Sequence, residues 1–501
     1  MDENSAKTRP FSAGVKSKFT NWLINMKIFI NLLKYTILSL LCVLALILLA
    51  IPISIYEMPN DLHAVDNTED IVLDNANYID VLTGKTIRNQ QIYLSKGRIV
   101  SIGEKTSSQS RDTRVIDLHG EYVVPGLFDM HVHLHDRKYL ALYLAYGVTS
   151  VRNMRGLPMH LRWKSELNRG DWLGSNLYTS SPVLDGERYA HALQQVVISP
   201  AKARELVRKY KDDGYDFIKA YGYLDKEVFE AITDEASRLD FPIAKHGPNP
   251  IDGLGLQSNS GLQSLEHVED IFQGPLNFSF DQNSMAIWVS QLKAINPTVT
   301  PTLATFHHLT KLSQDKAAFV DSLPLNTLNP LYRIINAEFG VKRWLGASQE
   351  QADWNSKEEQ FLFDIVRELD KQEVTLLLGS DGGTLYMPPG LSTHLEIELM
   401  VKAGISPIKV LRAATINAAT ALGVDDKYGS IEIGKVADLV VLKENPLDDL
   451  QALAAPIAVI KAGQWINSSE LSALRISAEK PSNLYISMGR LLEDIISRAM
   501  P

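Results

Sequence analysis

The hydrophobic positions along this 501-residue chain follow three patterns in succession. Residues 35–56 form a continuous apolar run of 22 residues without any Asp, Glu, Lys, Arg or His. From residue 71, short alternating runs separated by turn residues predict strands and hairpins, and similar runs return before residue 466. Between these two sets, short apolar runs alternate with amphipathic helical stretches. The pattern therefore predicts one apolar helix, a small β-domain built from both flanks, and an α/β body between them.

The central body contains eight short apolar runs that predict strands, and helical stretches lie between them. They cover residues 128–133, 149–154, 177–183, 217–220, 242–246, 264–267, 298–303 and 376–381. Strands that alternate with helices over about 300 residues predict a (β/α)8 TIM barrel, which we place at residues 125–424. An open doubly wound sheet is the alternative, although no G-x-G-x-x-G fingerprint follows any of these strands.

The segments on either side of the predicted barrel complete the domain organisation. Because the ends of a domain commonly lie close together, residues 64–124 and 425–466 predict one composite β-sandwich. Residues 304–375 are long for a connection within a barrel and predict a helical lid that narrows the substrate class. Residues 467–501 predict a C-terminal helical extension used for docking or homo-oligomerisation, and a solvated terminal helix explains that pattern equally well.

The apolar run at residues 35–56 is long enough to cross a membrane. At a rise of about 1.5 Å per residue it spans a hydrocarbon core of about 30 Å. A signal peptide usually has a shorter apolar region followed by a small-residue cleavage site, which is missing here. A buried core helix usually has apolar residues on one stripe, whereas this run is apolar on every face. We therefore expect a single-pass transmembrane anchor that contacts the lipid bilayer.

The distribution of charge gives this anchor an orientation. Residues 1–34 form a basic arm of formal charge +4, which leaves −13 on the remaining chain for a total of −9. Because basic flanks stay cytoplasmic, we expect a cytoplasmic N-terminus and an extracytoplasmic catalytic domain, periplasmic in a bacterium. The only cysteine, Cys42, lies inside the apolar run, so no disulfide is expected in the ectodomain. The acidic balance argues against nucleic acid as a partner.

Ligand-type side chains stand at the ends of five predicted barrel strands. They are His131, His133, Lys219, His246, His267 and Asp381. The first two are at positions i and i+2 of one strand and therefore share a face, and His135 continues the alternation as an expected outer neighbour. Active sites of TIM barrels lie at the carboxyl ends of the strands, so we expect these groups to meet at one mouth. Imidazoles and carboxylates suit zinc, with manganese, iron or nickel as alternatives.

Lys219 is the unusual member of this set. An unpaired ammonium at the end of a buried strand is costly in free energy. One explanation is an ion pair with Asp381 or with a glutamate. The other is a neutral amine that reacts with CO2, which gives a carbamate able to bridge two metal ions.

A series of longer motifs carries a family resemblance. In order along the chain they include VVPGLFDMHVHL, GVTSVRNM, DFIKAYGY, LQSLEHVED, LGSDGG and YGSIEIGKVADLVVLKENPL. Over roughly residues 70–466 the chain resembles the amidohydrolase superfamily, and within it the imidazolonepropionase-like and Xaa-Pro or Xaa-Arg dipeptidase-like branch. The resemblance implies two divalent metal ions, the more buried one held by His131, His133 and Asp381. It also implies that the second ion is held by His246 and His267, with carboxylated Lys219 as the bridge.

The expected reaction follows from the charge of such a site. Two dications that share one water lower its pKa towards neutrality, so that a metal-bridging hydroxide attacks a carbonyl carbon. Asp381 then acts as the proton shuttle to the leaving nitrogen of a dipeptide, an N-acyl amino acid or a cyclic amide. Lactone or ester hydrolysis uses the same hydroxide and is an alternative. A non-catalytic barrel that serves as a binding or assembly module is the other.

Three residues are candidates for binding the small-molecule substrate: Tyr221, Tyr223 and His394. The resemblance implies that a tyrosine in the loop after Lys219 helps to bind a substrate carboxylate, without choosing between the two. An ordinary loop aromatic explains either of them equally well.

The sequence also departs from the family pattern at one position. Relatives usually have an Arg-Asp pair after the second strand, where this chain has Asn153. Further along, Gly382 and Gly383 follow Asp381 directly. These glycines either let the backbone approach the substrate or form a structural turn.

Overall fold

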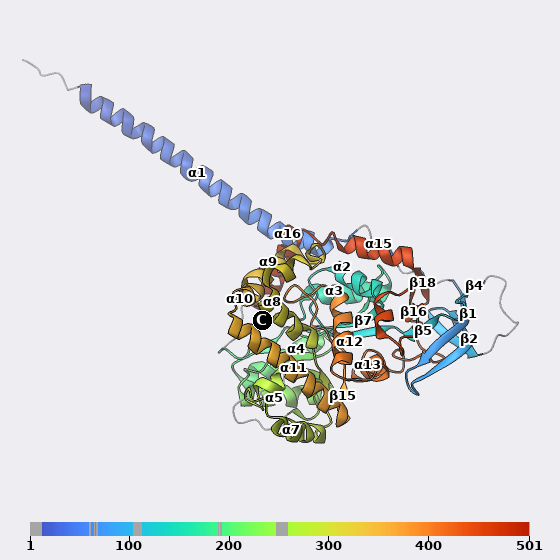
Figure 1. Ribbon diagram of the computed structural model, residues 1–501. Coiled ribbons are helices and arrows are strands. Elements are labelled where there is room, and N and C mark those ends of the chain that lie inside the picture. The colour runs from blue at the N-terminus through green and yellow to red at the C-terminus, as the bar shows by residue number, and fades with distance from the viewer. Residues whose placement is uncertain are drawn as a thin grey trace, which may run out of the picture.

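The structure, a computed structural model, describes residues 13–59, 62–64, 66, 69–103, 113–188, 190, 193–246 and 259–499. It divides into one long helix and a globular body (Figure 1). Helix α1 (Ala13–Tyr56) is a single helix of 44 residues that contains Pro52. It therefore begins well before the predicted span at residues 35–56, and the arm's residues 1–12 lie outside the described part.

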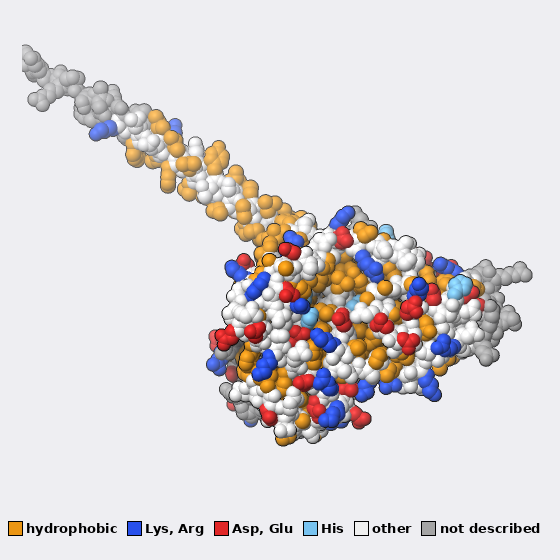
Figure 2. Space-filling view, in the orientation of Figure 1, with side chains coloured by type: hydrophobic (Ala, Val, Ile, Leu, Met, Phe, Trp, Pro, Cys, Tyr) orange, Lys and Arg blue, Asp and Glu red, His pale blue; other side chains and the backbone are white. Residues whose placement is uncertain are grey.

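Within the described residues, α1 contains one stretch that is long and apolar enough to cross a membrane. This stretch, Asn21–Tyr56, reaches a mean hydropathy of 2.9, and only 6% of its most apolar window is buried inside the protein. Figure 2 shows apolar side chains along the helix up to the point where it meets the globular body. Such exposure distinguishes α1 from the buried core helix of a soluble domain.

The small β-domain is one sheet of eight strands in the order β18-β17-β16-β5-β1-β2-β3, with β4 paired to β1. Its strands are β1 (Ile71–Asp80), β2 (Lys85–Ser95), β3 (Arg98–Gly103), β4 (Arg114–Asp117), β5 (Tyr122–Pro125), β16 (Leu439–Leu442), β17 (Ala458–Lys461) and β18 (Gln464–Asn467). Antiparallel pairing of β5 with β16 joins the two flanks. All eight strands are linked in one sheet because β1 pairs with β4 along its first half and with β5 further on.

The central body is built on eight strands that pair in parallel. They are β6 (Leu127–Val132), β7 (Val148–Asn153), β8 (Asn176–Thr179), β11 (Ile218–Ala220), β12 (Ile243–His246), β13 (Ser264–Glu266), β14 (Thr298–Thr300) and β15 (Thr375–Leu376). The first three form one run and the other five form a second, whose edge is extended by β9 (Leu184–Asp185) and β10 (Gln195–Val196). Parallel bridges Ser180–Phe217 and Val132–Gly382 connect the runs at both ends. Strands therefore occur at all eight predicted places, in a TIM-barrel-like arrangement.

Helices follow most of these strands and surround them. They are α2 (Arg137–Ala145), α3 (Pro158–Arg169), α4 (Pro200–Asp212), α5 (Lys226–Arg238), α6 (Glu269–Gln273), α7 (Gln282–Ala294), α12 (Leu391–Lys402), α13 (Pro407–Ala413) and α14 (Ile416–Ala421). At the start of α4, the Ser199 hydroxyl accepts a hydrogen bond from the Lys202 amide, and Pro200 follows at the first helical position.

The predicted lid and the C-terminal extension are both helical. Residues 304–375 contain most of α8 (Leu303–Asp321), then η2 (Leu325–Thr327), α9 (Pro330–Asn336), η3 (Ala337–Val341), α10 (Lys342–Leu345) and α11 (Gln349–Lys371). After η4 (Leu450–Ala454) and the last strands, the chain ends in α15 (Ser468–Ala478) and α16 (Leu484–Ala499). Helix α16 packs against α1 and α9 at the point where α1 leaves the body (Figure 1).

Candidate metal centre

The ends of β6 and β15 bring three of the predicted ligands together. Asp381 Oδ1 lies 3.0 Å from His133 Nε2 and 3.6 Å from His131 Nε2. One potential ligand atom from each of these side chains lies within 4.8 Å of the others. The Thr305 hydroxyl donates to Asp381 Oδ2 over 3.0 Å and holds the carboxylate in place. This spacing suits one divalent cation.

A second pair of histidines lies directly beside this group. The His267 ring centroid is 4.6 Å from that of His131 and 4.5 Å from that of His246. His246 Nδ1 is 2.6 Å from a carboxylate oxygen of Asp270, and His267 Nδ1 is 2.7 Å from the Thr302 hydroxyl. A ring whose Nδ1 is engaged in this way presents Nε2 to a metal ion, as is usual for metal-binding histidines.

Glu266 gives His131 the same kind of support. Its Oε2 lies 2.8 Å from His131 Nδ1, and its Oε1 accepts a hydrogen bond of 2.7 Å from Arg152 Nη2. All three side chains are fully buried. Burial acts to raise the pKa of Glu266, but Arg152 and His131 outweigh it and hold that pKa well below its usual value. The charged carboxylate therefore fixes the His131 tautomer that leaves Nε2 facing Asp381.

The amine of Lys219 lies buried and unpaired at the end of β11. Its Nζ has no hydrogen-bond partner in the described part of the chain and lies 5.8 Å from the centroid of the Tyr221 ring. The first explanation from the sequence, an ion pair with Asp381 or a glutamate, is therefore not observed. Burial lowers the pKa of Lys219 to about 8, although the Glu266 charge opposes this shift. A buried amine with lowered pKa and unused bonding capacity fits carboxylation.

Two of the predicted ligands have unusual backbone conformations. His267 has φ 67° and Asp381 has φ 59°, in the left-handed region that residues other than glycine rarely adopt. Such strain costs about 1 kcal/mol or more per residue and concentrates at functional sites, where the surrounding structure enforces it. The adjoining Gly383 has φ 98°, and a Cβ there would lie 2.1 Å from the His133 carbonyl oxygen. Contact with the end of β6 therefore explains Gly383, in agreement with the structural-turn alternative.

The structure separates the three candidate substrate-binding residues. Tyr221 lies beside the cluster, with its ring centroid 4.5 Å from that of His246. Tyr223, in contrast, is 50% exposed at the surface. His394 does not join the cluster, because on α12 its Nε2 donates to the Tyr146 carbonyl oxygen over 2.9 Å. Tyr221 is thus the candidate that the geometry favours.

Asn153 has a structural role that an aspartate could not fill. Its side-chain amide donates to the Arg155 carbonyl over 2.8 Å and to the Thr179 hydroxyl over 3.0 Å. Its side-chain oxygen accepts from the Leu134 amide over 3.1 Å. These bonds tie the segment after β6 to β7 and β8, and they require an NH2 donor.

Part of the helical segment 304–375 covers this mouth. The Tyr332 ring of α9 stacks on His135, with centroids 3.6 Å apart and an interplanar angle of 8°. Further along α9, Asn336 Nδ2 lies 3.4 Å from the Gly383 carbonyl oxygen. His135, expected behind the ligands, thus contacts the cover of the site.

Sequence reasoning did not identify Glu266, Arg152 or Thr302. Glu266 stands one residue before His267 in a three-residue strand whose members are all buried. A carboxylate in such a strand needs a positive or metal-bound partner, and that requirement was the available signal. The choice of His131 as that partner depends on the neighbouring strands.

The chain belongs to the amidohydrolase family. Residues 144–466, more than half of the chain, match the family profile described as Amidohydrolase family. An ochratoxinase of Aspergillus niger is 36% identical, with 75% of this chain and 82% of the relative covered. An adenine deaminase of Clostridium botulinum (strain 657 / Type Ba4) is 22% identical over 75% of this chain. The chain spans only 54% of the length of that deaminase.

Solved structures agree with the fold. A structure titled bottromycin amidohydrolase superposes with a TM-score of 0.66 and 23% identity, covering 86% of this chain and 93% of that chain. The crystal structure of A. niger ochratoxinase gives a TM-score of 0.58, with 19% identity over the superposed residues and coverage of 80% and 96%. These similarities establish the TIM-barrel-like amidohydrolase fold.

Proposed function

We propose that this protein is a membrane-anchored, metal-dependent amidohydrolase that cleaves a C–N bond in a dipeptide, an N-acyl amino acid or a cyclic amide. The observation that carries the proposal is the cluster at the mouth of the strands. Three of its imidazoles each have Nδ1 engaged by a neighbouring side chain, and they surround Asp381 and the unpaired Lys219 amine.

The donor set fits two divalent ions, of which zinc is the first choice and manganese, iron or nickel are alternatives. His131, His133 and Asp381 would hold the more buried ion. His246 and His267 would hold the second, and a carbamate on Lys219 would link the two. When bound, such ions lower the pKa of water to near neutrality and polarise a carbonyl oxygen.

Asp381 is the proton carrier in this proposal. Burial acts to raise its pKa, but His133 and His131 outweigh that effect and hold the pKa well below its usual range. The carboxylate is therefore charged at neutral pH and can accept a proton. Oδ1 faces the two imidazoles, and the Thr305 hydroxyl orients Oδ2, which is the oxygen that can pass the proton to the leaving nitrogen.

The anchor is the second part of the proposal, with the N-terminus cytoplasmic and the barrel outside the cytoplasm. Beyond the exposed apolar surface of α1, its end bonds to the body through Glu57, which pairs with Arg490 at 2.7 Å and with Arg137 at 3.4 Å. A cleaved signal sequence would have no need of such contacts. The basic residues upstream support this orientation.

A substrate panel tests the reaction. Full-length protein in lipid nanodiscs, loaded with zinc or manganese, should hydrolyse at least one of a set of Xaa-Pro, Xaa-Arg and N-acyl amino acid compounds. The variant Lys219→Ala should lose turnover and metal retention, with partial rescue by short-chain carboxylates. Unimpaired activity of this variant would remove the carbamate, and complete inactivity of the metal-loaded protein on the panel would contradict the reaction class.

Lys245 provides a matched control. It is as deeply buried as Lys219, and burial lowers its pKa to about 8 as well. However, it is adjacent to His246 in β12 and so leaves the strand on the opposite face, where its amine lies 6.0 Å from the Phe229 ring centroid and 3.4 Å from the His246 carbonyl oxygen. The variant Lys245→Met should therefore retain far more metal and turnover than Lys219→Ala.

A further inference from the structure

The amphipathic pattern of α16 is inverted relative to that of a soluble surface helix. Its charged residues Arg490 and Asp494 face the body and are only 3% and 0% exposed. Its exposed face instead carries large apolar side chains, each at least 41% exposed: Leu484, Met488, Ile495 and Ile496. We call these four residues the apolar stripe. A surface helix in water has the opposite arrangement, so an apolar environment on this side of α16 is expected.

The neighbouring cover of the site shows the same feature. Helix α9, which packs against α16, exposes Ile334 by 54%, and η3 exposes Phe339 by 88%. In Figure 1, α9 and α16 lie together where α1 leaves the body, and η3 packs against α9. Exposed apolar side chains therefore lie on more than one element near the C-terminal end of α1.

Direct contacts between α16 and α1 place the apolar stripe next to the apolar stretch of α1. The Tyr485 hydroxyl donates to the Leu46 carbonyl over 2.7 Å. A Cβ on Gly489 would lie 2.1 Å from the Ala50 carbonyl oxygen, so the two backbones are in direct contact. Leu46 precedes the end of α1 by ten residues, or about 15 Å of helix. Helix α16 therefore packs against the apolar run itself.

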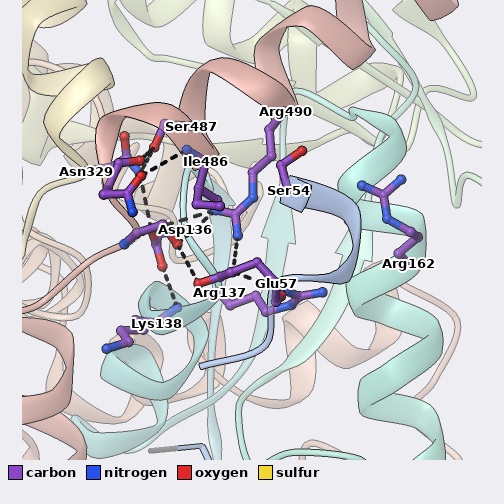
Figure 3. Close-up of polar contacts among 12 residues, drawn as sticks. Ser54, Glu57, Asp136, Arg137, Lys138, Arg162, Asn329, Ile486, Ser487 and Arg490 are labelled. Atoms are coloured by element: carbon purple, nitrogen blue, oxygen red, sulfur yellow. Dashed lines mark hydrogen bonds and ion pairs between the residues drawn. The ribbon is translucent and has the colours of Figure 1, made fainter. Parts of the chain in front are cut away.

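A buried polar network fixes the rotation of α16 (Figure 3). Arg490 pairs with Glu57 at 2.7 Å and lies 3.8 Å from Asp136. Its guanidinium carbon lies 5.2 Å from the Trp163 ring centroid. Because these contacts hold the charged face of α16 inwards, they also hold the apolar stripe outwards.

The same network includes the mouth of the strands. Asp136 lies a few residues after His131 and His133. It accepts a hydrogen bond of 3.1 Å from the side-chain amide of Asn329, which stands just before α9. Asn329 also donates to the Ser487 hydroxyl of α16 over 2.8 Å. The rim of the candidate metal centre, the cover of the site and the end of α1 are thus bonded together on one side of the protein.

We infer that α16 lies in the membrane interface, with its apolar stripe at the boundary of the acyl chains, and that the mouth of the barrel faces the bilayer. This inference rests on the proposed anchoring by α1. The bilayer is favoured over a second copy of the chain because α16 packs against α1, whose 36-residue stretch Asn21–Tyr56 is long and apolar enough to cross a membrane. A substrate would then enter from the membrane side.

Site-directed spin labelling of the full-length protein in nanodiscs of phosphatidylcholine and phosphatidylglycerol tests this placement. Labels are placed at native Cys42 and, in a Cys42→Ser background, at Met488→Cys, Ile495→Cys and Ile433→Cys. Ile433 is 66% exposed on the small β-domain and serves as the matched exposed control. Relative accessibility to oxygen and to a water-soluble nickel chelate reports whether each label lies in lipid or in water.

At Cys42, Met488 and Ile495 we expect an oxygen-to-nickel accessibility ratio about tenfold above that at Ile433, since only apolar reagents enter the acyl region. Labels at Met488 and Ile495 in water, with the Cys42 label in lipid, would overturn the inference and leave the anchor intact. A Cys42 label in water would overturn both. Shielding from both reagents with dipolar broadening between labels would place a second copy on the stripe and contradict the inference.

Discussion

Two buried networks of polar side chains lie near the mouth of the strands. They differ in whether every charged side chain has a partner within the protein. At the junction with α1, Arg490 and Arg137 have carboxylate partners in Glu57 and Glu166. In the metal centre, Lys219 Nζ has no partner among the described residues and Asp381 faces only imidazoles and a hydroxyl. Since buried polar groups are almost always satisfied, the complete network fits a structural role and the incomplete one fits a metal-binding role.

The largest expected effect is a loss of activity on substitution of Asp381, the proposed proton carrier of the incomplete network. Asp381→Asn should lower kcat/KM by about 10³-fold or more, because the amide cannot accept the proton. A matched control is Asp438→Asn, which removes a buried carboxylate paired with Lys461 at 2.7 Å in the small β-domain. That variant should lose stability and keep its activity, as measured by steady-state kinetics and thermal unfolding; equal losses of activity in both variants would contradict the assignment.

Removal of metal should lower the stability of the protein through the metal centre. At a metal-ion concentration about a thousandfold above Kd, bound ions add about 4 kcal/mol to the free energy of unfolding. Chelation should remove this stabilisation. Thermal unfolding with and without chelator measures the change, and Lys219→Ala should show a much smaller one. An unchanged midpoint for the wild type would mean that the cluster holds no stabilising ion.

Breaking the complete network should lower stability and leave activity unchanged. Arg490→Met leaves Asp136 and Glu57 without a charged partner on α16 and should cost about 3 kcal/mol of stability. The double variant Glu57→Gln with Arg490→Met should recover part of this loss, since the two residues interact directly. Unfolding curves provide the measurement, and kcat/KM of the folded fraction should stay constant. Strictly additive losses would show that the pair is not coupled.

The smallest expected effect concerns pH and a buried carboxyl beside the site. Glu396 is fully buried and accepts from the Ala304 amide over 2.6 Å, and burial raises its pKa to about 8. The folded state therefore keeps a proton that the unfolded chain releases near pH 4.5, so stability is greatest below that value and falls up to about pH 8. Between pH 5.5 and 7.5 the loss should be about 2–3 kcal/mol.

The control for this slope is Glu396→Gln, which has no proton to release. Metal-free protein is used, since metal binding itself depends on pH. The pH dependence of the unfolding midpoint should flatten in the variant relative to the wild type. An identical slope in both proteins would place the titrating group elsewhere.

The strands and the ligand-type residues at their ends could be read from the sequence, because both depend on local patterns. The alternation of His131 and His133 and the position of Asp381 after an apolar run were visible in one dimension. The partners were not, since Glu266 reaches His131 only when β13 lies near β6 in space. The position of His394 could not be read from the sequence either, because its contact with Tyr146 depends on how α12 packs.

The helical extension shows the same limit. The apolar period within residues 467–501 predicted a helical extension, and α16 forms over Leu484–Ala499. Periodicity gives the angular position of its apolar face and does not tell whether that face is turned towards the protein. Only the contacts of Arg490 and Asp494 show that the polar face is the buried one.

The central claim is that the incomplete network holds metal ions, and metal analysis of the full-length protein in nanodiscs tests it most directly. After expression with zinc or manganese, inductively coupled plasma mass spectrometry should find about two ions per chain, as expected of a binuclear hydrolytic site. Lys219→Ala should retain far less metal than either the wild type or Lys245→Met. A stoichiometry near zero in the wild type would contradict the account.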